Sequence, residues 1–119
     1  MIMRARSVSL ALVVALAAAT LQPARAGVPS VEECLEASDF IANAARARDN
    51  GLARERFLDR MDADFTAVRA FPPGLRWFVH DGEDESFLRD SVQSVFDQPA
   101  TPEDHRSAFL RACFDRMRA

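Results

Sequence analysis

Two cysteines, Cys34 and Cys113, constrain this chain more than any other residues, because they stand 79 positions apart. In an exported protein, which meets an oxidising compartment, an even pair of cysteines most simply forms one disulfide. In the chain-entropy model, closing a loop of this length stabilises the fold by about 4–5 kcal/mol. The alternative is two free thiols, including a catalytic cysteine, and an oxidising compartment disfavours it. We therefore expect the first and last parts of the folded chain to lie side by side.

The first 26 residues have the pattern of an export signal. Arg4 and Arg6 precede an almost wholly apolar run over residues 8–21, and Ala24-Arg25-Ala26 places small residues on both sides of an arginine, as signal peptidase requires. The apolar run has 14 residues and is shorter than the roughly 20 that span a bilayer. We expect cleavage near Ala26, no membrane anchor afterwards, and a mature protein in the periplasm or outside the cell.

The chain after the predicted signal is short and acidic. Residues 27–119 predict one small helical domain, and a chain of this size buries only about 60–65% of its unfolded surface, so a covalent link matters. The chain has no lysine, and cleavage would remove three of its 15 arginines. The remaining 12 arginines against 18 carboxylates give a net charge of −6. Because nucleic-acid binding proteins present basic surfaces, no nucleic-acid partner is expected.

Four segments of the chain have the spacing and the end signals of helices. Ser30 and Glu33 have the spacing of a capping box, Gly51 is a typical left-handed stop, and Pro102 suits the first turn of a helix. The predicted helices run from Ser30 to Gly51, from Ala53 to Phe65 or Val68, from Asp84 to Phe96, and from Thr101 to Met117.

Each predicted helix has one apolar face, and the face of the first is made mostly of small side chains, which allows close approach of another helix. The residues expected to point inward are Cys34, Ala37, Ser38, Ile41, Ala44 and Ala45; Phe57, Leu58, Met61, Phe65 and Val68; Phe87, Leu88, Val92, Val95 and Phe96; and Ala108, Phe109, Ala112, Cys113 and Met117. Four helices without a convincing strand pair predict an all-α four-helix bundle, with the first and last helices antiparallel and joined by the disulfide.

The segment LRWFVHDGEDE, residues 75–85, contains the only tryptophan and one of the two histidines. Prolines at 72 and 73 and a glycine at 74 end any preceding helix, and residues 75–79 are too few for periodicity to choose between a strand, a loop and a helix start. The candidates for a contact patch on the surface are Arg76, Trp77, Phe78 and His80. We favour the alternative, in which the apolar side chains of this segment fill the core.

The sequence contains no residue spacing that is typical of a metal site or of a catalytic site. The acidic run DGEDE lacks the alternating oxygen ligands of a calcium loop, and a helix start or a solvated face explains it better. The histidines at 80 and 105 match no zinc spacing, and His105 is predicted to lie on the surface. No G-x-S-x-G elbow surrounds any serine. We expect no metal, no cofactor and no enzymatic activity.

Several features occur in this chain in a recognisable combination. They are an export signal, the early Cys34, the A-x-x-R-D-N-G helix end at residues 45–51, V-F-x-x-P at residues 95–99, a proline-started last helix and the late Cys113. In this combination the chain resembles a group of small exported proteobacterial proteins of unassigned function. The resemblance implies a periplasmic all-α domain with a Cys34–Cys113 bridge. A more distant likeness, with no shared motif, is to acid-activated periplasmic chaperones.

The function that these observations favour is contact rather than chemistry. A disulfide-linked helical scaffold without a catalytic constellation suits a binding or interaction module with an unidentified protein partner. One alternative is an acid-responsive chaperone, since acid would turn the net charge from negative to positive. Another is a hydrolase inhibitor, for which arginine and aromatic side chains on a rigid scaffold are suitable.

Overall fold

The computed structural model describes residues 28–118, which form four α-helices and one short 3-10 helix. Their bounds are α1 Val31–Asp49, α2 Arg54–Val68, η1 Pro73–Leu75, α3 Gly82–Asp97 and α4 Pro102–Met117. Within this range there is no strand, and none of the helices is both long and apolar enough to cross a membrane. The predicted export signal at residues 1–26 lies outside the described residues.

The two ends of α1 follow the sequence signals closely. The hydroxyl of Ser30 accepts a hydrogen bond from the Glu33 amide, and the Glu33 carboxylate accepts one from the Ser30 amide, which completes the predicted capping box. At the other end Gly51 has a φ of +91°, and the amide of Leu52 donates to the carbonyl of Ala47. Together with the bond from the Gly51 amide to the Arg48 carbonyl, this makes a Schellman motif, so the predicted glycine stop is confirmed.

Helices α3 and α4 begin with a side-chain cap, whereas α2 does not. Thr101 accepts a bond from the amide of Asp104 and starts α4 as predicted. Asp81 does the same for the amide of Asp84, so α3 starts at Gly82, two residues earlier than its predicted start. Helix α2 has no side-chain cap at its first end, and it continues to Val68, the longer of its two predicted lengths.

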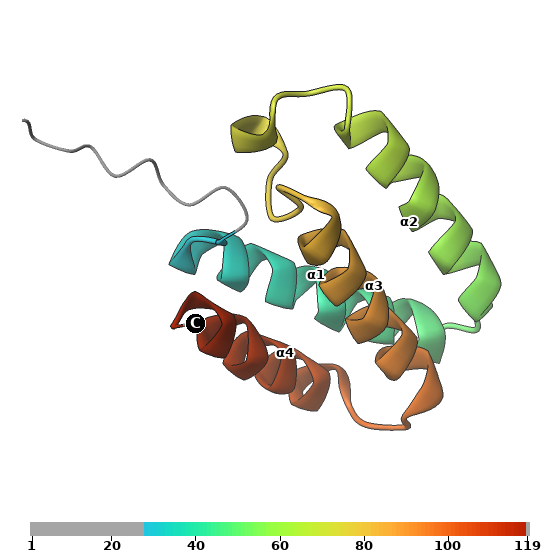
Figure 1. The fold of residues 1–119 in the computed structure, drawn as a ribbon. Helices are drawn as coiled ribbons and strands as arrows, with labels where there is room; N and C mark the ends of the chain where they lie inside the picture. Colours follow the sequence, from blue (N-terminus) through green and yellow to red (C-terminus); the bar gives the residue numbers. More distant parts are fainter. Residues whose placement is uncertain (1–27, 119) are drawn as a thin grey trace, which may run out of the picture.

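Helices α1 and α4 form the closest pair in the fold and run antiparallel (Figure 1). The disulfide between Cys34 and Cys113 joins them, with 5.9 Å between the two Cα atoms. Helix α3 packs against α1, and α2 packs mainly on α3 at the outer side of the molecule (Figure 1). The predicted all-α bundle, with its first and last helices antiparallel and linked, is therefore confirmed.

The core has small side chains along α1 and large ones around them. Within α1 the disulfide sulfur of Cys34 lies in line with buried alanines and Ile41, which lets the neighbouring helices approach closely. The other buried apolar side chains are Leu58, Met61, Phe65, Phe78, Val79, Leu88, Val92, Val95, Phe109 and Cys113.

The inward face of α4 differs from its prediction. Ala108 is exposed, and His105 is buried in its place, in line with Phe109 and Cys113 at intervals of four residues. The disulfide explains this choice, because a face that contains Cys113 includes the positions four and eight residues before it. The prediction that His105 lies on the surface is therefore wrong.

The chain between α2 and α3, residues 69–81, forms an irregular loop that contains η1 (Figure 1). We call it the α2–α3 loop. Of the strand, loop and helix considered for residues 75–79, the structure has a loop that crosses the core, with Phe78 and Val79 buried. Leu75, in contrast, is 72% exposed and does not contribute to the core.

Candidate functional site

The four candidate contact residues have different environments in the α2–α3 loop. Phe78 is fully buried, and its ring lies 6.1 Å from that of Phe87 and 5.7 Å from that of Phe109. A residue so placed contacts no partner, so Phe78 does not belong to a surface patch. The burial of this side chain follows from the small size of the α1 residues, which leave volume for large rings from elsewhere.

Trp77 lies at the surface and is held in one orientation. Its side chain is 37% exposed, its indole N–H donates to the Glu36 carboxylate at 2.7 Å, and its ring meets that of Phe40 edge-on at 6.1 Å. The residue has a φ of +53°, which is rare for a bulky side chain and costs on the order of 1–2 kcal/mol. The surrounding contacts therefore fix both the backbone and the ring.

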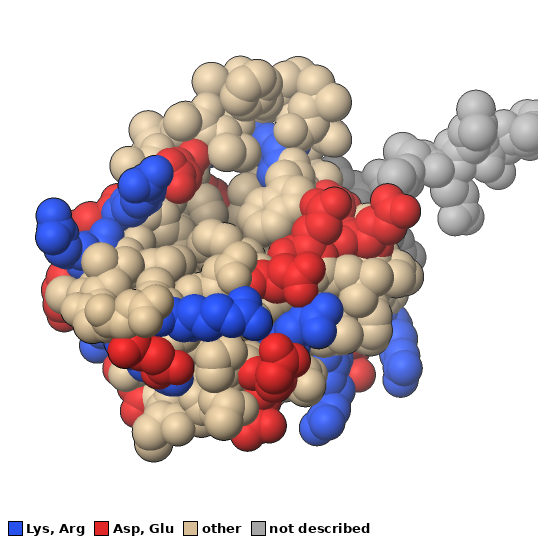
Figure 2. Space-filling view, turned by 180° about the vertical axis from the view of Figure 1, so that it is seen from behind, with Lys and Arg blue, Asp and Glu red and all other residues tan. Residues whose placement is uncertain are grey.

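Arg76 is used inside the loop rather than at its surface. Its guanidinium donates to the carbonyls of Phe71 and Arg69, at 2.7 and 3.2 Å, and so ties the two arms of the α2–α3 loop together. Phe71 and Leu75 are exposed in the same loop, which forms the largely uncharged top of the molecule in Figure 2. Of the predicted patch, the accessible part is thus centred on Trp77.

A groove of about 600 Å³ lies between α1 and α2, beside Trp77. We call it the α1–α2 groove; its lining residues are Phe40, Leu52, Arg56, Phe57, Arg60, Met61 and Asp64. The rings of Phe40 and Phe57 lie 5.7 Å apart, and Phe40 also contacts Trp77, so an aromatic row connects the groove with the loop. On the face of the molecule seen in Figure 2, the uncharged surface has a hollow, and charged side chains lie beside it.

Two arginines that line the α1–α2 groove form no ion pair with their neighbours in the part of the chain that the structure describes. Arg56 and Arg60 are one turn apart on α2, and neither forms an ion pair with any residue in the range 28–118. Two acids on the outer face of α1 are already engaged: Glu36 by Trp77, and Asp39 by Arg106 at 2.9 Å. The groove therefore has one wall with available positive charge.

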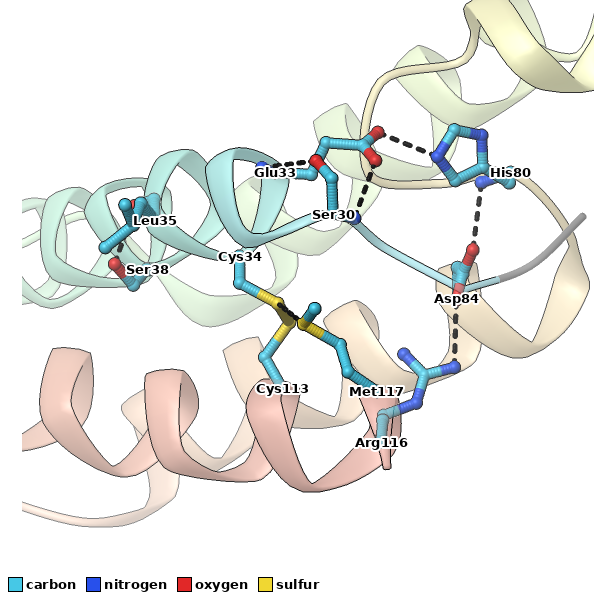
Figure 3. The surroundings of a disulfide bond; sticks show 10 residues. All are labelled: Ser30, Glu33, Cys34, Leu35, Ser38, His80, Asp84, Cys113, Arg116 and Met117. Atoms are coloured by element: carbon cyan, nitrogen blue, oxygen red, sulfur yellow. Dashed lines mark hydrogen bonds and ion pairs between the residues drawn. A yellow bond between two sulfur atoms is a disulfide. The ribbon is translucent and has the colours of Figure 1, made fainter. Parts of the chain in front are cut away.

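A polar network fixes the far end of the α2–α3 loop next to the disulfide (Figure 3). The ring nitrogens of His80 lie 2.6 Å from the carbonyl oxygen of Pro73 and 2.7 Å from a carboxylate oxygen of Glu33. Both neighbours are acceptors, so the doubly protonated ring satisfies both. Burial lowers the pKa of His80, but the bonds to Pro73 and Glu33 outweigh it and leave the pKa above its usual 6.5.

Asp84 and Arg116 continue this network into α3 and α4 (Figure 3). The carboxylate of Asp84 is fully buried and accepts bonds from the His80 amide at 3.1 Å and from Arg116 at 2.8 Å. Its burial raises the pKa of this carboxyl above 3.8, although Arg116 opposes the rise. The expected helix start is present, but Asp84 is not on a solvated face. Sequence reasoning missed this pair.

A second network, also missed from the sequence, closes the other end of the α1–α4 pair. Arg48 donates to the backbone carbonyls of Val95, Gln98 and Ala100, at 2.6, 2.9 and 2.8 Å. The ring of the buried His105 lies 3.0 Å from the same Gln98 carbonyl. Both side chains hold the connection between α3 and α4 against α1, which is a structural role.

The ring of His80 is committed to hydrogen bonds inside the fold. Both nitrogens of His80 are engaged by acceptors, so neither is free to take a proton from a nucleophile. Among residues 28–118 no three His, Cys, Asp or Glu side chains gather closely enough to hold a metal ion. The α1–α2 groove has room for a ligand.

Comparison with known proteins adds no relative. A scan of protein-family models, a search of curated proteins and a search of solved structures found no match to this chain. The resemblance to small exported proteobacterial proteins stays a prediction, and a functional proposal rests on the geometry.

Proposed function

We propose that the protein is an exported, non-enzymatic interaction module that binds an apolar segment of a partner protein in the α1–α2 groove. The observation that carries this proposal is the groove itself, an opening lined by Phe40, Phe57 and Met61 with the fixed ring of Trp77 beside it. One recurring mode of peptide recognition places the apolar face of an amphipathic helix in an apolar groove.

The rigidity of the aromatic row supports this proposal. Trp77 is restrained by Glu36 and Phe40, so little side-chain freedom remains to be lost on binding. Tryptophan is also enriched among the residues that dominate binding energy. Export is supported by the Cys34–Cys113 disulfide, since such bonds persist mainly in oxidising compartments.

The acid-responsive chaperone is less well supported than the interaction module. Loosening in acid requires groups whose protonation destabilises the fold; Asp62, in its exposed pair with Arg89, is one such group, and its contribution is small. The pKa values of His80 and Asp84 are both raised, so the folded state holds these protons more tightly than the unfolded chain. Protonation of either group therefore stabilises the fold at this end of the bundle. The hydrolase inhibitor remains a form of the same proposal, with the hydrolase as partner.

The test is a titration of the mature protein with an amphipathic leucine-rich peptide, followed by the fluorescence of Trp77. The groove variant is Leu52→Glu, and the matched control is Leu35→Glu, because these leucines are exposed to similar extents, 39% and 41%, and only Leu52 lines the groove. We expect the groove variant to weaken binding about tenfold or more and the control to change it less than about twofold. Equal binding by both variants, or no binding at about 1 mM peptide, would overturn the proposal.

A further inference from the structure

The α1–α2 groove has an asymmetric distribution of charge along its α2 wall. Arg56 and Arg60 follow each other at the end near Leu52, and Asp64 stands one turn further on. Residues four apart share a helix face, so the three side chains form a row with two positive charges followed by one negative charge.

The positive end of this row consists of two arginines that are not committed to an ion pair within residues 28–118. Within residues 28–118, seven arginines pair with a carboxylate, whereas Arg56 and Arg60, like Arg76, Arg111 and Arg118, do not. The first end of α2 also has no side-chain cap, and the unpaired amides of a helix start favour negative charge nearby. Both features add positive potential at the same end of the groove, and Glu55 in the first turn of α2 offsets part of it.

We propose that the partner segment is acidic, an apolar peptide whose carboxylates meet Arg56 and Arg60 while its apolar side chains enter the groove. This inference rests on the proposed function, because it names the class of partner that the groove holds. Guanidinium groups bind carboxylates through two parallel hydrogen bonds, which gives them direction as well as charge.

Asp64 sets the orientation of the segment. A carboxylate placed opposite Asp64 would be repelled, so the acidic residues of the partner lie at the Leu52 end of the groove and a neutral or basic residue lies at the Asp64 end. The two ends of the partner segment therefore differ in charge: one end is acidic and the other is not.

The experiment compares three peptides as long as α2, 15 residues, with the same apolar face and with Glu, Gln or Lys at the positions that face Arg56 and Arg60. The protein variants are R56Q/R60Q and the control R111Q/R118Q, which removes the same charge from exposed arginines that form no ion pair within residues 28–118. Trp77 fluorescence gives the dissociation constants, and circular dichroism checks that each variant is folded.

We expect the Glu peptide to bind the natural protein about tenfold tighter than the Gln peptide, and the Lys peptide to bind weakest. R56Q/R60Q should abolish the difference between the Glu and Gln peptides, the control should keep it, and added salt should reduce it. Equal binding of the Glu and Gln peptides would overturn this inference and leave the proposed function standing.

Two further results are informative. If none of the peptides binds, the proposed function fails and the inference with it. Binding of phosphatidylglycerol vesicles that is lost in R56Q/R60Q, without a preference among the peptides, would overturn the acidic peptide in favour of a lipid surface.

Discussion

The α1–α4 pair and α2 are held in the bundle by different means. The pair is joined by a covalent bond between two fully buried sulfurs, and its far end is closed by Arg48. Helix α2 has three buried residues, no side-chain cap, and charged contacts to α3 that are open to solvent. Stability is thus concentrated in one part of the molecule.

This difference bears on where binding is possible. The α1–α4 seam buries its apolar side chains against each other, whereas α2 stands far enough from α1 to leave the groove open. The disulfide and the buried contacts of the α1–α4 pair supply stability that α2 does not. The following predictions, from the largest expected effect to the smallest, test whether the division is real.

Removal of the disulfide should have the largest effect. Replacing Cys34 and Cys113 together by alanine opens a loop of 79 residues, and the free energy of unfolding should fall by about 4–5 kcal/mol. Urea unfolding followed by far-UV circular dichroism measures the loss. A loss below about 1 kcal/mol would mean that the α1–α4 pair does not depend on the covalent link.

Replacing Arg48 by methionine should destabilise the same pair by about 3 kcal/mol, because the carbonyls of Val95, Gln98 and Ala100 each lose a hydrogen bond at once. The matched control is Arg46→Met, two residues away, where an exposed pair with Glu103 is lost and the cost should be below about 0.5 kcal/mol. Similar costs for both variants in urea unfolding would contradict a structural role for Arg48.

Arg116→Met should lower the free energy of unfolding by about 2–3 kcal/mol at neutral pH, since it leaves the buried carboxylate of Asp84 without its partner. The pKa of Asp84 is raised by burial, so its destabilising effect is present at high pH and disappears as the pH falls through the folded pKa toward 3.8. Losing Arg116 raises that pKa further. The difference between variant and natural protein should therefore shrink in acid, and unfolding measured from pH 7 to pH 4 tests this.

The contact between His80 and Glu33 should have a smaller effect, limited to the α2–α3 loop. The pKa of His80 is raised, so its contribution is complete below 6.5 and is lost as the pH rises through the folded value. Amide hydrogen exchange at Val79 should therefore accelerate at alkaline pH beyond the intrinsic increase, and His80→Gln should remove that extra change. An unchanged profile in the variant would show that another group controls the loop.

The exposed pair between Arg89 and Asp62, which joins α2 to α3, should contribute least. A side-chain bond from Arg89 lowers the pKa of Asp62, so the contribution is present above 3.8 and is lost as the pH falls through the folded value. Both side chains are well exposed, and Arg89→Ala should cost only about 0.5 kcal/mol, less at high salt. A cost above about 2 kcal/mol would mean that α2 is held in the bundle as strongly as α1 and α4 are held to each other.

The parts of the fold that depend on local sequence could be predicted. The Ser30 capping box, the Gly51 stop and the proline start of α4 involve residues within a few positions of each other, and so their side chains meet whatever the rest of the chain does. The Cys34–Cys113 link was predictable for another reason, because two cysteines allow one intramolecular pairing.

The parts that depend on distant neighbours could not be predicted. The sequence places Arg48 in the last turn of a helix. Only the folded chain shows that its side chain binds three carbonyls of residues that lie 47 to 52 positions later. The burial of Asp84 and the free charge of Arg56 depend on long-range contacts in the same way. For His105 a signal did exist, since the disulfide fixes the face of α4 that contains Cys113.

The position of the disulfide has a mechanical consequence. The described chain enters α1 at residue 31 and leaves α4 at residue 117, and the sulfur bond joins residues 34 and 113. Tension applied through the two tails would pass from Cys34 to Cys113 through that bond. The 78 residues enclosed between them, including both walls of the α1–α2 groove, would carry none of the load.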